Sequence, residues 1–193
     1  MANLFKTLEY EAYRAGINPR TKEAQDWFRK RVRTINRVNR LDLMDTEELK
    51  LVNRQNPLIG SMNMFFYDAK HKDTLPYYDK FPLAIIVGPA PGGFYGLNLH
   101  YIPPRERAVL MDELNNYATN NKYDETTRLK LSYDLLKGIG RAVPCVKRYL
   151  GSNVRSNTVR INADEWEIAI FLPVERFQKQ KKSVVWNDSK KYY

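Results

Sequence analysis

The chain has 193 residues, of which 43% are hydrophobic and 12% aromatic, and it carries a formal net charge of +10 with a pI of about 9.6. This apolar content is enough for a packed interior and excludes a globally disordered chain. The length fits one domain with extensions, since domains usually run to about 100–200 residues. The positive surplus favours an anionic partner, first nucleic acid and then an acidic protein surface, because neutralising phosphates releases condensed counterions.

The basic residues are concentrated in three stretches. Residues 1–42 hold ten Lys or Arg against five Asp or Glu, residues 128–160 hold eight against one, and residues 174–193 hold six against two. The distribution predicts a basic helical region at 1–42, a linker at 43–58, a core at 59–173 and a basic tail at 174–193. Solvated faces that keep the protein soluble are the alternative explanation of the same charges.

Cysteine content and hydropathy limit the compartment and the cofactors. Cys145 is the single cysteine, so neither an intramolecular disulfide nor a zinc site built on cysteine pairs is expected. No run of about 18 apolar residues occurs, and the start MANLFKTLEYEAYRAG lacks the apolar block of a signal peptide. We therefore expect assembly in the cytoplasm, with no membrane partner and no cofactor.

Hydrophobic periodicity predicts two helices near the N-terminus. The first covers Asn3 to Ala15, and the second covers Thr21 to Arg40 with its apolar residues on one side. The opposite side of the second helix carries Arg29, Lys30, Arg33, Arg37 and Arg40. This basic stripe is predicted to bind DNA or an acidic partner. A short helical turn is expected in the linker, at Asp45 to Leu51.

Three strands are expected at residues 61–67, 81–87 and 93–102, separated by the turn-forming segments AKHKDTLPYYDK and GPAPGG. Pro103 and Pro104 then begin a helix, because a missing N–H costs least at the first helical position. A further helix at Thr126 to Gly138, capped by Asp124, and a final strand at Glu167 to Leu172 complete the pattern. The predicted fold is α+β, a small antiparallel sheet, open or barrel-like, with flanking amphipathic helices and basic terminal arms.

The C-terminal third supplies further candidates for contact with DNA or a protein partner. These are Lys147, Arg148, Lys181, Lys182 and Trp186. The segment from Lys179 to Tyr193 has few apolar anchors, so we expect it to be disordered alone and to become ordered against a partner.

No catalytic constellation is convincing. GPAPGG lacks the ending of a phosphate-binding loop and is predicted to be a hairpin turn. His71 is expected to be exposed, His100 to be a structural imidazole with a general base as the alternative, and Cys145 to pack as a small apolar residue. Clustered carboxylates can hold the metals of a nuclease, which keeps one enzymatic alternative open at Asp164, Glu165 and Glu167, together with Asp79. Position 169, where such a nuclease needs lysine, is alanine.

Residues 76–81 are predicted to form a structural corner and not an active site. In this interpretation Asp79 accepts backbone N–H groups of the loop and Phe81 enters a strand. Asp79→Asn is then expected to cost about 1 kcal/mol or less, and Phe81→Ala about 3–5 kcal/mol.

Several strings of the sequence resemble a virion structural protein of contractile-tailed, cyanophage-like bacteriophages, in the DNA end protector or head-completion family. They are EYEAYRAGINPRTKEAQDWFRK, GSMNMFFYDAKHKDTLPYYDKFPL, GGFYGLNLHYIPP and EWEIAIFLP. The resemblance covers most of the chain and brings no catalytic residue with it. It implies a small protein that adds to a growing virion.

Together, these observations predict a non-enzymatic virion protein in a symmetric assembly, with other virion proteins and double-stranded DNA as partners. Its basic regions would contact packaged DNA or acidic neighbouring subunits. A tail or baseplate component without DNA contact is the first alternative, and a metal-dependent nuclease is the second.

Overall fold

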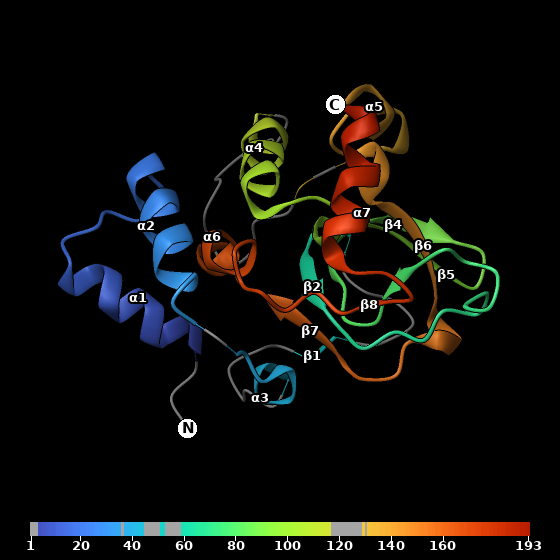
Figure 1. The fold of residues 1–193 in the computed structure, drawn as a ribbon, viewed down its shortest axis with the longest axis horizontal. Coiled ribbons are helices and arrows are strands. Elements are labelled where there is room, and N and C mark those ends of the chain that lie inside the picture. The colour runs from blue at the N-terminus through green and yellow to red at the C-terminus, as the bar shows by residue number, and fades with distance from the viewer. Residues whose placement is uncertain (1–3, 36, 45–50, 53–58, 117–128, 130) are drawn as a thin grey trace.

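The computed structural model describes residues 4–35, 37–44, 51–52, 59–116, 129 and 131–193, which form helices around an antiparallel sheet (Figure 1). The described helices are α1 (Leu4–Arg14), α2 (Lys22–Val32), α3 (Arg40–Met44), α4 (Pro104–Asn115), α5 (Tyr133–Gly138), α6 (Trp166–Ala169) and α7 (Lys182–Ser189). The strands are β1 (Leu51–Val52), β2 (Met62–Met64), β3 (Tyr78–Asp79), β4 (Leu83–Ala90), β5 (Gly93–Asn98), β6 (Val146–Leu150), β7 (Thr158–Ile161) and β8 (Phe177–Gln178). The predicted α+β class is confirmed.

The main sheet is open. Its strand order is β1-β7-β2-β4-β5-β6, with every pair antiparallel, and among the described residues the edge strands β1 and β6 do not pair with each other. The barrel-like alternative is therefore wrong. GPAPGG forms the β4–β5 hairpin as predicted, and Gly92 takes the positive φ of 74° that this turn requires. Strands β3 and β8 form a separate two-stranded ribbon.

Both faces of the sheet are buried, because alternate residues of each strand enter different cores. Leu83 and Ile85 of β4 face a large core to which every described helix contributes a side chain. Ala84 and Ile86 face a smaller aromatic core. In that core the ring of Phe65 packs edge-on against other rings, with centroids 5.2 Å from Tyr149 and 5.7 Å from Phe94. Helices and loops thus cover both sides of a rigid sheet.

The first predicted helix is confirmed, but the second ends earlier than expected. Helix α2 begins after the N-cap Thr21, whose side chain accepts from Ala24 N, and ends at Val32. The hydroxyl of Thr34 donates to Arg31 O at 2.7 Å, and such side-chain bonds to the backbone compete with continued helix. Arg40 instead opens α3. The five basic residues therefore do not form one helical face.

Residues 167–172 are the clearest error of secondary structure, because α6 replaces the predicted strand. Asn162 and Glu165 form a reciprocal capping box that starts a helical turn there. Residues 168–172 are all apolar, and a short apolar run does not separate strand from helix by periodicity. The sequence analysis also missed β6 and β7.

Two other predicted helices fall partly outside the described residues. Helix α5 begins at Tyr133 behind the N-cap Ser132, later than the expected Thr126, while Asp124 lies outside the described residues. The expected turn at Asp45 to Leu51 also lies outside them, except that Leu51 belongs to β1. Helix α4 begins at Pro104 as predicted.

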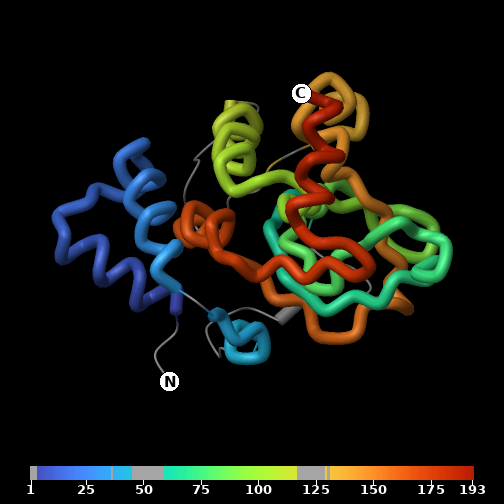
Figure 2. The backbone as a smooth tube through the Cα atoms, in the orientation of Figure 1, coloured from blue at the N-terminus to red at the C-terminus, as the bar shows by residue number. Residues whose placement is uncertain are grey.

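The C-terminal segment is part of the fold and not a free arm. Its β8 pairs with β3, its α7 buries Val185, and the chain ends beside α5 (Figure 2). The Trp186 indole donates from Nε1 to His100 O at 2.9 Å. The expected disorder of 179–193 is therefore wrong for this chain. None of the described helices has the length and apolarity needed to cross a membrane.

Candidate nucleic-acid interface

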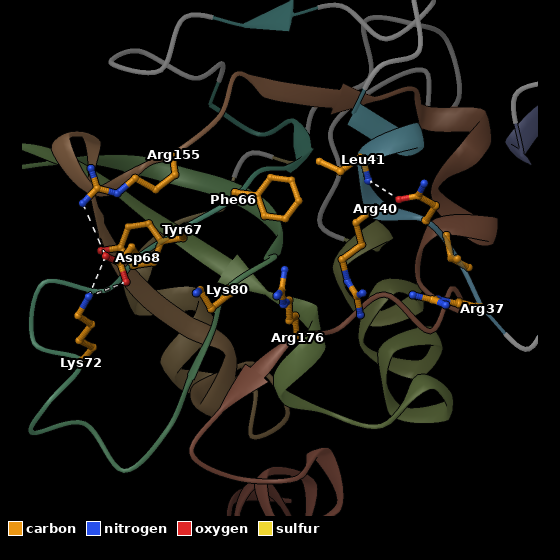
Figure 3. A pocket seen from close by; sticks show the side chains of 12 residues that line it. Arg37, Arg40, Leu41, Phe66, Tyr67, Asp68, Lys72, Lys80, Arg155 and Arg176 are labelled. Carbon is orange, nitrogen blue, oxygen red and sulfur yellow. Dashed lines mark hydrogen bonds and ion pairs between the residues drawn. The ribbon is translucent and has the colours of Figure 1, made fainter. Parts of the chain in front are cut away.

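A concave surface with a volume of about 880 Å³ lies between α3 and the loops around the β3–β8 ribbon (Figure 3). We call it the basic groove, because six of its lining side chains are basic: Arg37, Arg40, Lys72, Lys80, Arg155 and Arg176. Asp68 is the single acidic residue in its lining. Figure 3 shows Lys80 and Arg176 in the middle, between the Asp68 end and the end formed by Arg37 and Arg40.

Backbone hydrogen bonds hold the middle of the groove in place. Lys80 N donates to Arg176 O at 2.8 Å, which extends the β3–β8 pairing by one step. Tyr67 N donates to Lys80 O at 3.0 Å, so the 66–68 segment lies against the same ribbon. The two central cations are thus carried on rigid backbone.

The Arg40 guanidinium fixes one end of the groove. It donates from Nε to Val174 O at 2.7 Å and from Nη2 to Glu175 O at 3.1 Å. Burial and the positive charge of Arg176 lower the pKa of Arg40. Arg40 therefore joins α3 to the C-terminal segment while adding to the positive charge.

Charge pairing divides the groove cations into two sets. Asp68 bonds Lys72 Nζ at 3.0 Å and lies 3.7 Å from Arg155 Nη2, and the bond from Lys72 holds the pKa of Asp68 below its usual range. By contrast, Arg37, Lys80 and Arg176 make no ion pair with any described residue. These three side chains therefore add positive charge to the groove that no ion pair with a described residue offsets.

Two aromatic residues form part of the groove lining. The half-buried ring of Phe66 packs on buried Phe81 with centroids 4.8 Å apart. Tyr67 is buried, and its hydroxyl accepts from Leu150 N at 3.2 Å. These two packed rings form the aromatic part of the groove lining beside the cations.

A second hollow, which we call the second pocket, has a volume of about 580 Å³ and lies where α2, α4 and α7 meet. Its basic lining residues are Arg29, Arg33, Arg105 and Lys182. Trp186 and Phe171 supply aromatic surface, and Glu175 is its acidic residue.

The residues predicted to bind DNA or a protein partner lie on different surfaces in the structure. Arg37 and Arg40 line the basic groove, whereas Arg29, Arg33, Lys182 and Trp186 line the second pocket. Lys30 and Lys181 are exposed and line neither.

Lys147 and Arg148 are not brought to either surface and line a different hollow. The Lys147 amine packs 3.9 Å from the Tyr101 ring centroid, and burial lowers its pKa. Arg148 donates to Pro91 O at 2.6 Å.

Four groove cations were missed by the sequence analysis: Lys72, Lys80, Arg155 and Arg176. Each stands in a different loop or beside a short strand, and Lys72, Lys80 and Arg155 have no basic neighbour three or four positions away. The one local signal concerns Lys80, which stands within the predicted corner, in the string YYDKF.

The backbone bonds predicted for Asp79 in the structural corner are confirmed, whereas Phe81 lies before β4, which begins at Leu83, and does not enter a strand. Asp79 is 3% exposed and accepts from Phe81 N and Arg176 N at 3.0 Å and from Asn98 Nδ2 at 3.2 Å, while its Oδ2 lies 2.7 Å from His100 Nδ1. Burial alone would raise the pKa of Asp79, but His100 and the two N–H groups more than offset it and lower the pKa. His100 is fully buried, as its structural role requires.

The acids of the nuclease alternative are not gathered in one place. Glu165 caps the turn before α6, Glu167 accepts from Arg20 N at 3.0 Å, and Asp164 is exposed. Asp79 is enclosed in its own corner, and no group of three acids, histidines or cysteines suited to a metal occurs among the described residues. Cys145 is buried, which raises its pKa to about 12, and His71 is exposed, both as predicted.

Comparison with curated proteins and with solved structures finds no match. A family model described as "Phage T4 terminal DNA protecting protein" matches residues 3–191, nearly the whole chain. The match confirms the resemblance to a phage DNA end protector family that the sequence strings indicated. The chain therefore belongs to the phage T4 terminal DNA protecting protein family.

Proposed function

We propose that this protein binds the ends of phage DNA through the basic groove and shields them without cleaving them. The observation that carries the proposal is a set of three cations, Arg37, Lys80 and Arg176, that line a concave surface and make no ion pair with a described residue. The family description, which names the protection of terminal DNA, supports the choice of ligand.

The chemistry of the groove suits a phosphate backbone better than base edges. Arg and Lys that contact phosphates position a protein on DNA but carry no sequence information. An end-binding protein with such contacts accepts any terminal sequence. Lys72 and Arg155 add two more cations, and both pair with the same carboxylate, that of Asp68. The groove therefore keeps a net positive charge along its length.

The absence of cleavage belongs to the proposal as well. The histidine best placed for acid–base chemistry, His100, is fully buried and bonded to Asp79, so it has no access to DNA. Protection then results from occupancy, because a protein seated on the terminus excludes an exonuclease.

The salt dependence of binding tests the groove. We expect a fluorescently labelled linear duplex to bind the wild-type protein, with a log–log salt slope that falls by about 0.9 for each phosphate that a variant no longer neutralises. The triple variant Arg37→Ala/Lys80→Ala/Arg176→Ala is the probe. Its matched control is Lys22→Ala/Lys70→Ala/Lys190→Ala, which removes three exposed cations outside the groove.

The two variants have equal net charge, so a difference between them reports position and not total charge. A flatter slope in the groove variant alone supports the proposal. Equal slopes in the groove variant and the wild type would show that the groove does not contribute to DNA binding.

We also propose that the protein acts within the virion, beside neighbouring subunits. Helix α1 supports this, because Tyr10 and Tyr13 are 61% and 80% exposed, and large aromatic side chains are common anchors of protein interfaces. Tyr10→Ala/Tyr13→Ala is expected to reduce incorporation into particles while leaving DNA binding unchanged, as measured by the amount of the protein in purified virions. Normal incorporation would contradict a role of α1 in assembly.

A further inference from the structure

The second pocket has the dimensions and the composition of a small-ligand site. Its volume of about 580 Å³ falls within the roughly 300–1,000 Å³ typical of ligand pockets. Positive charge and flat apolar surface occur in it together. That combination suits a nucleotide, which joins an anionic phosphate to an aromatic base.

Two of the pocket cations are available for a phosphate. Arg29 bonds Asp26 at 2.7 Å, and Lys182 bonds Glu175 at 3.1 Å. Arg33 and Arg105 are exposed at the pocket and make no ion pair with a described residue. Guanidinium groups bind phosphate oxygens in a bidentate manner, so this pair provides the donors that one phosphate group requires.

The pocket also has a fixed aromatic surface. The hydrogen bond from Trp186 Nε1 to His100 O holds the indole, and two cations lie over its ring, Lys182 Nζ at 5.3 Å and Arg107 Cζ at 5.8 Å from the centroid. Pro103 and Phe171 add flat apolar surface. A base stacked on such surfaces gains free energy whatever its sequence.

The second pocket adjoins the basic groove through two stretches of chain. Arg33 and Ile35 line the pocket, and the same stretch continues to Arg37 in the groove. On the other side, Glu175 lines the pocket and the next residue, Arg176, lines the groove. The second pocket therefore lies next to the basic groove.

We propose that the second pocket binds one unpaired nucleotide at the terminus of the DNA. The base would stack beside Trp186, and its phosphate would contact Arg33 and Arg105. Only an unstacked base offers a free face to an indole, because bases inside a duplex are covered by their neighbours. This inference rests on the proposed function, and it adds recognition of the terminus itself to contact with the backbone.

Three DNAs of the same duplex sequence test the inference: one with blunt ends, one with a single unpaired nucleotide at one end, and one closed by hairpins at both ends. We expect wild-type protein to bind the unpaired end about five- to 150-fold more tightly than the blunt end, the range set by stacking of one base. Arg33→Ala/Arg105→Ala is expected to reduce this ratio to about one. Lys30→Ala/Lys190→Ala, which removes two exposed cations outside both surfaces, is expected to retain it.

A direct titration separates a nucleotide site from a general anion site. Tryptophan emission is followed while deoxyadenosine monophosphate, deoxyribose 5-phosphate or inorganic phosphate is added. We expect only the nucleotide to give a saturable change, and we expect Trp186→Phe to abolish it. An equal response to inorganic phosphate would overturn the inference.

The failures of the two proposals are distinguishable. If the wild type prefers linear duplex to the hairpin-closed duplex but binds blunt and unpaired ends equally, the pocket inference is wrong and the proposed function stands. If it binds linear and closed duplexes equally, the proposed function is wrong, and the inference that rests on it is wrong as well.

Discussion

The corner around Asp79 and the basic groove both contain charged side chains, and they use them in opposite ways. In the corner, each Asp79 oxygen is bonded within the fold, by Phe81 N and Arg176 N on one side and by Asn98 and His100 on the other. In the groove, the side chains of Arg37, Lys80 and Arg176 make no ion pair with a described residue. Partnered buried charges stabilise the fold, whereas unpartnered charges at the surface remain available to a ligand.

The two regions are also connected. The backbone N–H of Arg176 donates to Asp79, while its exposed side chain lines the groove. Lys80 follows Asp79 directly and pairs with Arg176 through the backbone. The corner therefore sets the positions of the groove cations. Changes to the corner are expected to act on stability, and changes to the groove on binding alone.

The largest effect is expected from Phe81→Ala. Phe81 is fully buried against the half-buried Phe66, so truncation leaves a cavity and is expected to lower the free energy of unfolding by about 3–5 kcal/mol. Chemical denaturation measures it, with the more exposed Phe66→Ala as a control that costs less. A loss below about 1 kcal/mol would show that the corner is not held by its apolar base.

Asp79→Asn is expected to cost about 2–4 kcal/mol, more than the 1 kcal/mol expected from the sequence alone. The sequence analysis treated Asp79 as a loop residue bonded only to backbone. In the structure its Oδ2 faces Asn98 Nδ2 and His100 Nδ1. An asparagine side chain at position 79 would therefore place its own amide N–H group against an N–H group of one of these neighbours. Asp164→Asn, at an exposed acid, is the control and is expected to be neutral. Equal stability of the two variants would contradict the structural role of Asp79.

Glu165 is a second buried acid, and it differs from Asp79 in the direction of its pKa shift. Burial raises the pKa of Glu165 to about 7 in the folded protein. Its folded pKa lies above its unfolded pKa of about 4.5, so the folded state binds the extra proton between these values. Stability is therefore expected to fall as pH rises from about 4.5 to 7, by about 1–3 kcal/mol in total, and to level off above that range. Denaturation midpoints across this pH range test it. Glu165→Gln should flatten the profile, and an unchanged profile would assign the dependence to another group.

The smallest expected effect concerns Asp68, the one acidic residue lining the groove. Asp68→Asn releases Lys72 and Arg155 from their ion pairs, so DNA is expected to bind about two- to tenfold more tightly at low salt, with a smaller gain at high salt. Asp73→Asn, at an exposed acid in the same loop, is the control. Weaker binding by Asp68→Asn would mean that Asp68 itself positions the contacting cations.

Residues with local signals were the ones that the sequence predicted well. The α1 pattern, the hairpin at GPAPGG, the helix after Pro103 and the corner at Asp79 each depend on neighbours within a few positions. The strand predicted at residues 167–172 was wrong because the signal for a helix lies outside that run. The capping box that selects a helix lies upstream of it.

Only two of the six groove cations were predicted from the sequence. Arg37 and Arg40 were found because they stand in a basic stretch, although the predicted helical stripe was wrong. Lys80 and Arg176 are nearly a hundred positions apart and meet only through the β3–β8 pairing. No spacing in the sequence encodes such a pairing, because a two-residue strand has no periodicity.

Degradation of a linear duplex by a double-strand exonuclease, with magnesium present, tests the central claim most directly. Wild-type protein and the control Lys22→Ala/Lys70→Ala/Lys190→Ala are expected to slow the loss of the terminal label, and the protein alone is expected to leave the DNA intact. The groove variant Arg37→Ala/Lys80→Ala/Arg176→Ala is expected to lose most of this protection while it remains folded, because these three groove cations supply the phosphate contacts in this account. Full protection by the groove variant, or cleavage of the DNA by the wild-type protein alone, would contradict the account.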